Sequence, residues 1–182
     1  MQPASEKFAD EKFGRAAIYL HWLTAIAMVP TVIYGLVSVY ADGAEMTREA
    51  LLIHQTVGTA IFILVLFRTV WRLTHPAPPL PAETPRYQKV GATLTHMLLY
   101  VTMVALPVTG YMGLAARGRD ISMAGLFDLP RIVPLDRRLS VNAQNLHDYG
   151  QYVLYALLAL HVAAALYHHF IVKDGILRRM WP

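Results

Sequence analysis

Four long apolar segments constrain this chain more than any other feature of its sequence. They cover about residues 16–41, 51–73, 90–116 and 146–172, and each is long enough for a helix to cross a hydrocarbon core, which needs roughly 20 residues. The chain is 55% hydrophobic and only 15% charged, whereas about a quarter of a soluble domain is usually charged. We therefore predict an all-α integral membrane four-helix bundle, with residues 1–182 forming a single domain.

The distribution of Lys and Arg predicts the orientation of this bundle. An even number of spans places both termini on one side, and ten of the 16 Lys and Arg residues fall on that side. Because positively charged connections stay preferentially in the cytoplasm, both termini are predicted to be cytoplasmic. The net charge of +4 then reflects topology, and no motif indicates binding of nucleic acid.

Two connections differ in their predicted structure. The inner one, residues 74–86, is rich in proline and is predicted to be extended. The outer one, residues 117–145, is the longest, and its Gly and Pro residues predict irregular structure with a short surface helix. This outer loop is the candidate external binding surface.

Histidines recur at membrane depth. His54 and His147 are predicted to form an outer layer, and His21, His96 and His161 an inner one. Ionisable groups inside a bilayer are costly and commonly functional, although a single histidine can simply hydrogen-bond a neighbouring helix. His147 and His161 are fourteen residues apart, so they lie on nearly the same helix face, roughly 21 Å apart along the axis.

Two layers of facing imidazoles predict two haems, each held by one histidine from each of two helices, since bundle cores commonly hold such cofactors. The outer haem would take His54 and His147. The inner one would take two of His21, His96 and His161, with His161 fixed by the fourteen-residue spacing. The irons would bind these imidazoles without covalent attachment of the porphyrin, because the chain has no cysteine.

Glycines near these layers are compatible with flat rings in the bundle. Gly35 and Gly110 lie fourteen residues after His21 and His96, at the predicted level of the outer haem, and Gly58 and Gly150 lie one turn from the outer histidines. Membrane helices also use glycine simply to pack closely.

Other uses of clustered histidines fit the sequence less well. A zinc or iron site prefers closely spaced ligands or nearby carboxylates, and Asp148 is the one carboxylate beside these histidines. Proton relays usually contain buried carboxylates as well. Haem binding is therefore the favoured interpretation; a histidine-rich transporter or a purely structural bundle, both colourless, is the non-redox alternative.

The four segments also resemble a known family. The stretches "AIYLHWLTA", "IHQTVGTAIFILVLFRTVWRLTHPAPP", "LTHMLLYVTMVALPVTGYM" and "LHDYGQYVLYALLALHVAAALYHHFIVKDGILRRMWP" are similar to the bacterial cytochrome b561 family over nearly the whole chain from Gly14. The resemblance implies a multi-pass cytochrome of the bacterial inner membrane with two non-covalent haem b groups. It assigns His21 and His161 to the inner haem and His54 and His147 to the outer one, and leaves His96 a supporting hydrogen-bond role.

The similarity is greatest to small di-haem members, and it implies an oxidoreductase. Superoxide would be oxidised to dioxygen at the periplasmic side, and ubiquinone would be reduced near the inner haem. The alternative is a membrane relay subunit that passes electrons between a partner dehydrogenase or hydrogenase and the quinone pool. A loop would then be a protein interface.

Several polar side chains are candidates for the substrate sites. Outer cations that could steer superoxide, or simply be solvated, are Arg117, Arg119, Arg137 and Arg138. Residues that could bind or protonate a quinone, or simply lie at the headgroup level, are His168, Arg72, His75 and Lys173. Arg68 could pair with a propionate of the inner haem or snorkel to the interface.

Overall fold

The computed structural model describes residues 12–80 and 84–182. Its long helices are α2 (Arg15–Tyr40), α3 (Ala44–Thr74), α4 (Arg86–Ala115) and α5 (Arg137–Tyr167). All four are long and apolar enough to cross a membrane, the last span running on to Val172. The predicted all-α membrane four-helix bundle is confirmed. The first eleven residues and residues 81–83 of the proline-rich connection lie outside the described residues.

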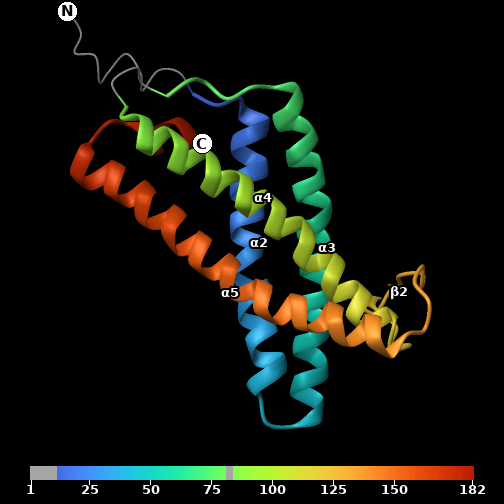
Figure 1. The fold of residues 1–182 in the computed structure, drawn as a ribbon. Helices are drawn as coiled ribbons and strands as arrows, with labels where there is room; N and C mark the ends of the chain where they lie inside the picture. Colours follow the sequence, from blue (N-terminus) through green and yellow to red (C-terminus); the bar gives the residue numbers. More distant parts are fainter. Residues whose placement is uncertain (1–11, 81–83) are drawn as a thin grey trace, which may run out of the picture.

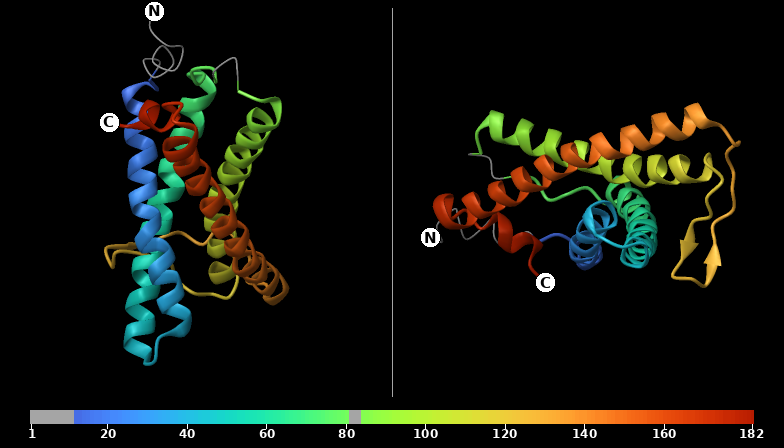
Figure 2. Two further views of the ribbon diagram at one scale, coloured as in Figure 1. Left: turned by 90° about the vertical axis from the view of Figure 1, so that its left-hand side faces the viewer. Right: turned by 90° about the horizontal axis from the view of Figure 1, so that it is seen from below.

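The bundle is built from two helical hairpins. Helix α2 packs along α3, and α4 packs along α5, while contact between the hairpins runs mainly between α3 and α4. Figure 1 shows the α4–α5 hairpin crossing the α2–α3 hairpin obliquely, and Figure 2 shows the two pairs from the side and from below. We call the end with the start of α2 and the C-terminus the inner end, and the opposite end the outer end.

The helices begin and end at other residues than the apolar segments do, because glycine and capping side chains determine where a helix stops. Gly43 has φ 105°, a conformation that glycine adopts at no steric cost, and it separates α2 from α3. Asp136 caps α5, its Oδ1 accepting the backbone N–H of Leu139 at 3.0 Å. Residues 137–145, predicted as loop, are therefore the start of α5.

The remaining outer loop contains a small hairpin. Strand β1 (Ser122–Met123) pairs antiparallel with β2 (Phe127–Asp128). The predicted short surface helix is absent from residues 117–136, and the turn between the strands contains Ala124 and Gly125 at positive φ, which no right-handed helix contains. The backbone N–H of Ala124 donates to Thr56 Oγ1 at 2.9 Å, which ties the hairpin to α3.

The chain reverses after α5 and returns to the start of α2. A π-helical turn, η1 (His168–Val172), is followed by a 3-10 helix, η2 (Ile176–Met180). Trp22 Nε1 donates to the carbonyl of Met180 at 2.6 Å. The C-terminal segment therefore covers the inner end beside His21, the one histidine of α2.

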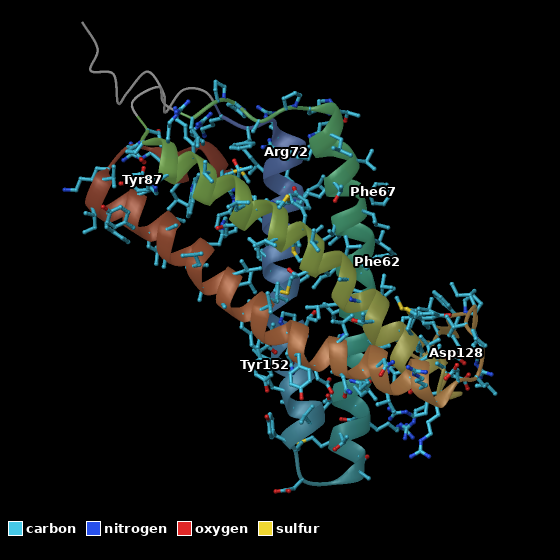
Figure 3. All side chains as sticks on the ribbon, in the orientation of Figure 1. Phe62, Phe67, Arg72, Tyr87, Asp128 and Tyr152 are labelled. Carbon is cyan, nitrogen blue, oxygen red and sulfur yellow. The ribbon has the colours of Figure 1, made fainter. Side chains whose placement is uncertain are left out.

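Apolar side chains fill the middle of the bundle and also cover its outside. The buried cluster consists of Met28, Ile61, Val65, Leu99, Met103, Leu154 and Leu157. In α5, Leu154 and Leu157 of this cluster lie between His147 and His161. On the outside, Phe67 is 65% exposed and Ile26 is 67% exposed, and Figure 3 shows Phe67 pointing away from the helices. An apolar surface of this extent requires a lipid environment.

Candidate haem-binding sites

The outer histidines face each other from different hairpins. His54 of α3 and His147 of α5 have ring centroids 6.0 Å apart, with their planes at 88°. Two imidazoles that bind one metal ion through bonds of about 2 Å have ring centroids about 6 Å apart. The predicted outer pair is thus brought together at a spacing that fits one shared iron.

Both outer rings are held in the same way by the neighbouring helix. His54 Nδ1 donates to the carbonyl of Thr31 in α2 at 2.8 Å, and His147 Nδ1 donates to the carbonyl of Leu106 in α4 at 2.8 Å. A carbonyl can only accept, so in each neutral imidazole Nδ1 carries the hydrogen and Nε2 has a free lone pair. That tautomer, fixed by a backbone carbonyl, is the usual state of a histidine that binds a metal.

Two glycines make room for these rings. A Cβ at Gly35 would lie 2.8 Å from His54 Nδ1, and a Cβ at Gly110 would lie 3.0 Å from His147 Nδ1. Both positions were expected to leave space at the outer level, and both do so directly beneath an imidazole. Gly150 instead allows Leu106 to pack closely, because a Cβ at this position would lie 2.9 Å from Leu106 Cδ2. A Cβ at Gly58 would have only Thr31 Cγ2 within 4 Å, at a distance of 3.9 Å.

A cavity surrounds the outer pair. It has a volume of about 200 Å³ and is lined by residues of all four helices, including His54, His147, Gly35, Gly58 and Gly110. Its polar lining includes Ser38, Gln55, Gln144, Asp148, Gln151 and Tyr155. The space between the hairpins is therefore open where a flat cofactor would lie against both imidazoles.

The inner histidines form a group of three. The ring centroid of His161 is 6.1 Å from that of His21 and 5.3 Å from that of His96. His21 Nδ1 is buried without a hydrogen-bond partner among the described residues, and such orphaned groups commonly mark a missing partner. The His21–His161 spacing matches that of the outer pair, and these two residues also come from different hairpins.

The donor sets fit haem better than a bare metal ion. In residues 12–80 and 84–182, no group of three or more His, Asp or Glu side chains could hold a metal ion. Haem iron needs only axial ligands from the protein, because the porphyrin supplies the others. Facing imidazole pairs, glycine cradles and a cavity between hairpins are what this cofactor requires.

Arg68 lies at the inner level and is partly buried. Its guanidinium lies over the ring of Tyr100, 5.3 Å from the centroid. This contact joins α3 to α4.

The four quinone candidates are not gathered into one group. His168 is paired with Asp174, His75 is stacked on Trp71 with centroids 3.9 Å apart, and Arg72 lies over the Phe13 ring at 5.9 Å. Lys173 is exposed at the turn after η1. Among the described residues, the side chains of these four are joined by no hydrogen bond, ion pair or ring contact; the one bond between two of the residues is the backbone bond from the Lys173 N–H to the His168 carbonyl.

The four outer arginines are exposed near the junction of α4, the loop and α5. Arg117 donates from Nε to Ser140 Oγ at 3.2 Å, while Arg119, Arg137 and Arg138 are exposed. Asp148, next to His147, is hydrogen-bonded to Gln144 at 2.8 Å. In the sequence, the carboxylate of Asp148 is therefore closer to the outer histidine pair than any of these four arginines is.

Sequence reasoning missed the groups that orient the histidines. The carbonyls of Thr31 and Leu106 gave no signal, because every residue has a carbonyl and only the packing of two helices selects one. The pairing of His168 with Asp174 was also missed, although the Lys173–Gly175 stretch after the apolar segment signals a turn that could bring an acid back to the helix.

Comparisons with known proteins agree with this geometry. The model of the family described as prokaryotic cytochrome b561 matches residues 12–182. Two Escherichia coli K12 proteins are similar over most of their lengths: cytochrome b561 homolog 1, 30% identical over 94% of this chain and 97% of its own, and cytochrome b561 homolog 2, 32% identical over 93% and 91%. A Yersinia pestis protein named probable superoxide oxidase CybB is 28% identical over 94% of this chain and 97% of its own.

The fold and the facing imidazoles define the class as a membrane-embedded haem protein of the four-helix type. The chain belongs to the prokaryotic cytochrome b561 family. It is accordingly a multi-pass bacterial membrane protein that binds b-type haem and transfers electrons.

Proposed function

We propose that this protein is a superoxide:quinone oxidoreductase that carries two haem b groups. Superoxide delivers its electron at the outer end and leaves as dioxygen, and ubiquinone is reduced at the inner end. The observation that carries the proposal is the presence of two imidazole pairs with centroids 6.0 and 6.1 Å apart, one near each end of the bundle. The name of the Yersinia pestis relative supports the choice of donor.

The proposed ligands are His54 and His147 for the outer haem and His21 and His161 for the inner one. His96 is given a supporting role for two reasons. Its ring centroid is 5.3 Å from that of His161, which is shorter than the spacing in the other two pairs. Moreover, α4 and α5 are packed directly together within one hairpin, so a porphyrin between these two residues would have to separate the helices.

The haems supply one-electron transfer when bound, and the chain supplies their environment. Thr31 and Leu106 fix the outer ligands through backbone carbonyls. Arg68 is placed to offset the charge of an inner propionate. The apolar cluster between the two levels excludes water from the path between them.

The outer arginines are the proposed steering groups for the superoxide anion. Arg117, Arg119, Arg137 and Arg138 are exposed where α4 ends and α5 begins, and clustered cations raise the encounter rate with small anions. The proposed quinone site lies at the inner end, where His168, Arg72, His75 and Lys173 offer hydrogen-bond donors. Both termini lie on the cytoplasmic side in this proposal.

The direct test uses the purified chain in detergent or vesicles. Superoxide should reduce the haems, as followed by their absorbance spectrum. The reduced protein should then convert a short-chain ubiquinone to quinol, with no other protein present. Superoxide dismutase added beforehand should abolish both signals. A protein whose haems stay oxidised under a steady supply of superoxide would refute the proposed donor.

One observation favours a second candidate, a relay subunit for a partner redox protein. Asp148 lines the outer cavity beside His147, and a carboxylate there opposes the approach of an anion. A relay would show haem reduction only when a partner dehydrogenase or hydrogenase is supplied. Neutralising Asp148 separates the two ideas, since Asp148→Asn should speed reduction by superoxide but not by a docked protein.

A further inference from the structure

The turn after the fourth span fixes an aspartate against a histidine. His168 Nδ1 lies 2.5 Å from Asp174 Oδ2, and the other carboxylate oxygen, Oδ1, accepts the backbone N–H of Ile176 at 3.1 Å. The π-helical turn that leads there is closed by the Lys173 N–H donating to the His168 carbonyl at 2.7 Å. Lys173 itself has φ 58°, a conformation that a non-glycine residue adopts at some cost. π-helical turns are frequent at functional sites.

We propose that Asp174 is a positioning residue that orients His168 and supports its positive charge, so that His168 Nε2 donates protons to a quinone oxygen at the inner end. This inference rests on the proposed function. The His168 and Asp174 side chains are 17% and 21% exposed, so their attraction is less screened than that of a surface pair. Because Nδ1 is engaged by Asp174, Nε2 is the nitrogen available to a ligand, and it has no hydrogen-bond partner among the described residues.

The segment around His168 is otherwise rich in basic side chains. The titratable and charged groups on η1, the following turn and η2 are His169, Lys173, Arg178 and Arg179, with Tyr167 of α5 at 5.8 Å between ring centroids. Asp174 is the one carboxylate in residues 168–182. Without Asp174, no other acidic side chain of residues 168–182 could accept the hydrogen of His168 Nδ1.

The proton balance is complete with groups already named. Reduction of one quinone to quinol takes two electrons and two protons; two superoxide ions supply the electrons and leave as two dioxygen molecules. For each proton, the Nε2–H bond of the imidazolium breaks and an O–H bond forms on the quinone. The neutral imidazole keeps its Nδ1–H on Asp174 and regains the Nε2 proton from water at the inner end. His161 lies seven residues away on nearly the same helix face, about 10 Å along the axis.

The test follows re-oxidation of chemically reduced protein by a short-chain ubiquinone, so that it does not depend on superoxide. Asp174→Asn should lower the rate of re-oxidation about 10- to 100-fold, the range found when the carboxylate that orients a metal-binding histidine is removed. Asp174→Glu, which keeps the carboxylate, should recover most of the rate. The haem spectrum and the rate of reduction by superoxide should not change. Asp42→Asn makes the same charge change at the exposed outer turn and should not change the rate of re-oxidation.

A second variant covers the case in which Asp174→Asn folds poorly. His168→Gln should slow quinone reduction at least as much, and the double variant should be no slower than His168→Gln, because the two residues act as one unit. Re-oxidation at the wild-type rate in both Asp174→Asn and His168→Gln would overturn the proposed roles of these two residues and leave the proposed quinone reductase activity standing. A wild-type protein that quinone does not re-oxidise at all would overturn the proposed quinone reductase activity together with these roles.

Discussion

At the scale of single residues, the outer site depends on positions where nothing but hydrogen fits. The rings of His54 and His147 lie against the backbone of the neighbouring helix, at Gly35 and Gly110. This close approach is what lets each Nδ1 reach a backbone carbonyl. The glycine is therefore part of the means by which the ring is oriented, beyond any role in packing the helices.

Gly35→Ala should accordingly remove the outer haem. The added Cβ would lie 2.8 Å from His54 Nδ1, which is too close for two atoms that are not bonded, so the ring must turn and lose its bond to Thr31. Haem content, measured from the absorbance of the extracted pigment, should fall by about half. Gly91→Ala is the matched control: its Cβ would meet nothing within 4 Å, and replacing a helical glycine stabilises by about 0.5–1 kcal/mol. Equal haem content in the two variants would disprove the claim that Gly35 makes room for the His54 ring.

At the scale of helices, each hairpin holds its own outer ligand. His54 is fixed within the α2–α3 hairpin and His147 within the α4–α5 hairpin, while direct contact between the hairpins is concentrated along α3 and α4. In the proposed arrangement both haems join ligands of different hairpins. Haem would thus connect two units that are otherwise preformed.

Removal of haem should therefore loosen the contact between hairpins but not within them. The chain has no cysteine, so spin labels can be placed freely at exposed positions. Labels at Val39 and Tyr149, on α2 and α5, should give a longer and broader distance distribution after haem is extracted. Labels at Val39 and Met46, within one hairpin, should give the same distribution in both states. A change in the second pair rather than the first would contradict this division of the bundle.

The helices and their order were predictable from the sequence, whereas their ends and contacts were not. Hydropathy detects the part of a helix that lies in lipid, so it missed residues 137–145 of α5, which are polar but capped by Asp136. The histidine layers followed from the fourteen-residue spacing of His147 and His161. The proposed choice of His21 over His96 did not follow from that spacing, because it depends on which helices pack directly, and this is a property of the folded bundle.

At the scale of the whole molecule, the proposed reaction has a direction across the membrane. The loop between α4 and α5, with its exposed arginines, would face the periplasm, and the turn with His168 and Asp174 would face the cytoplasm. Electron donor and proton source would then lie on opposite sides. The sidedness is a separate claim from the chemistry and can be tested alone.

Single cysteines should report this sidedness. Leu126 is 82% exposed in the outer hairpin and Tyr87 is 73% exposed at the start of α4. In intact spheroplasts, a membrane-impermeant thiol reagent should label Leu126→Cys and leave Tyr87→Cys unmodified until the cells are lysed. The reverse pattern would show that both termini are periplasmic.

The most direct test of the account is the ratio of haem to chain in purified protein and in four single variants. We expect two haems in the wild type, one after His54→Ala, His147→Ala or His21→Ala, and two after His96→Ala. A wild-type protein with a single haem, or one that loses haem with His96→Ala but not with His21→Ala, would contradict the proposed pairing of imidazoles.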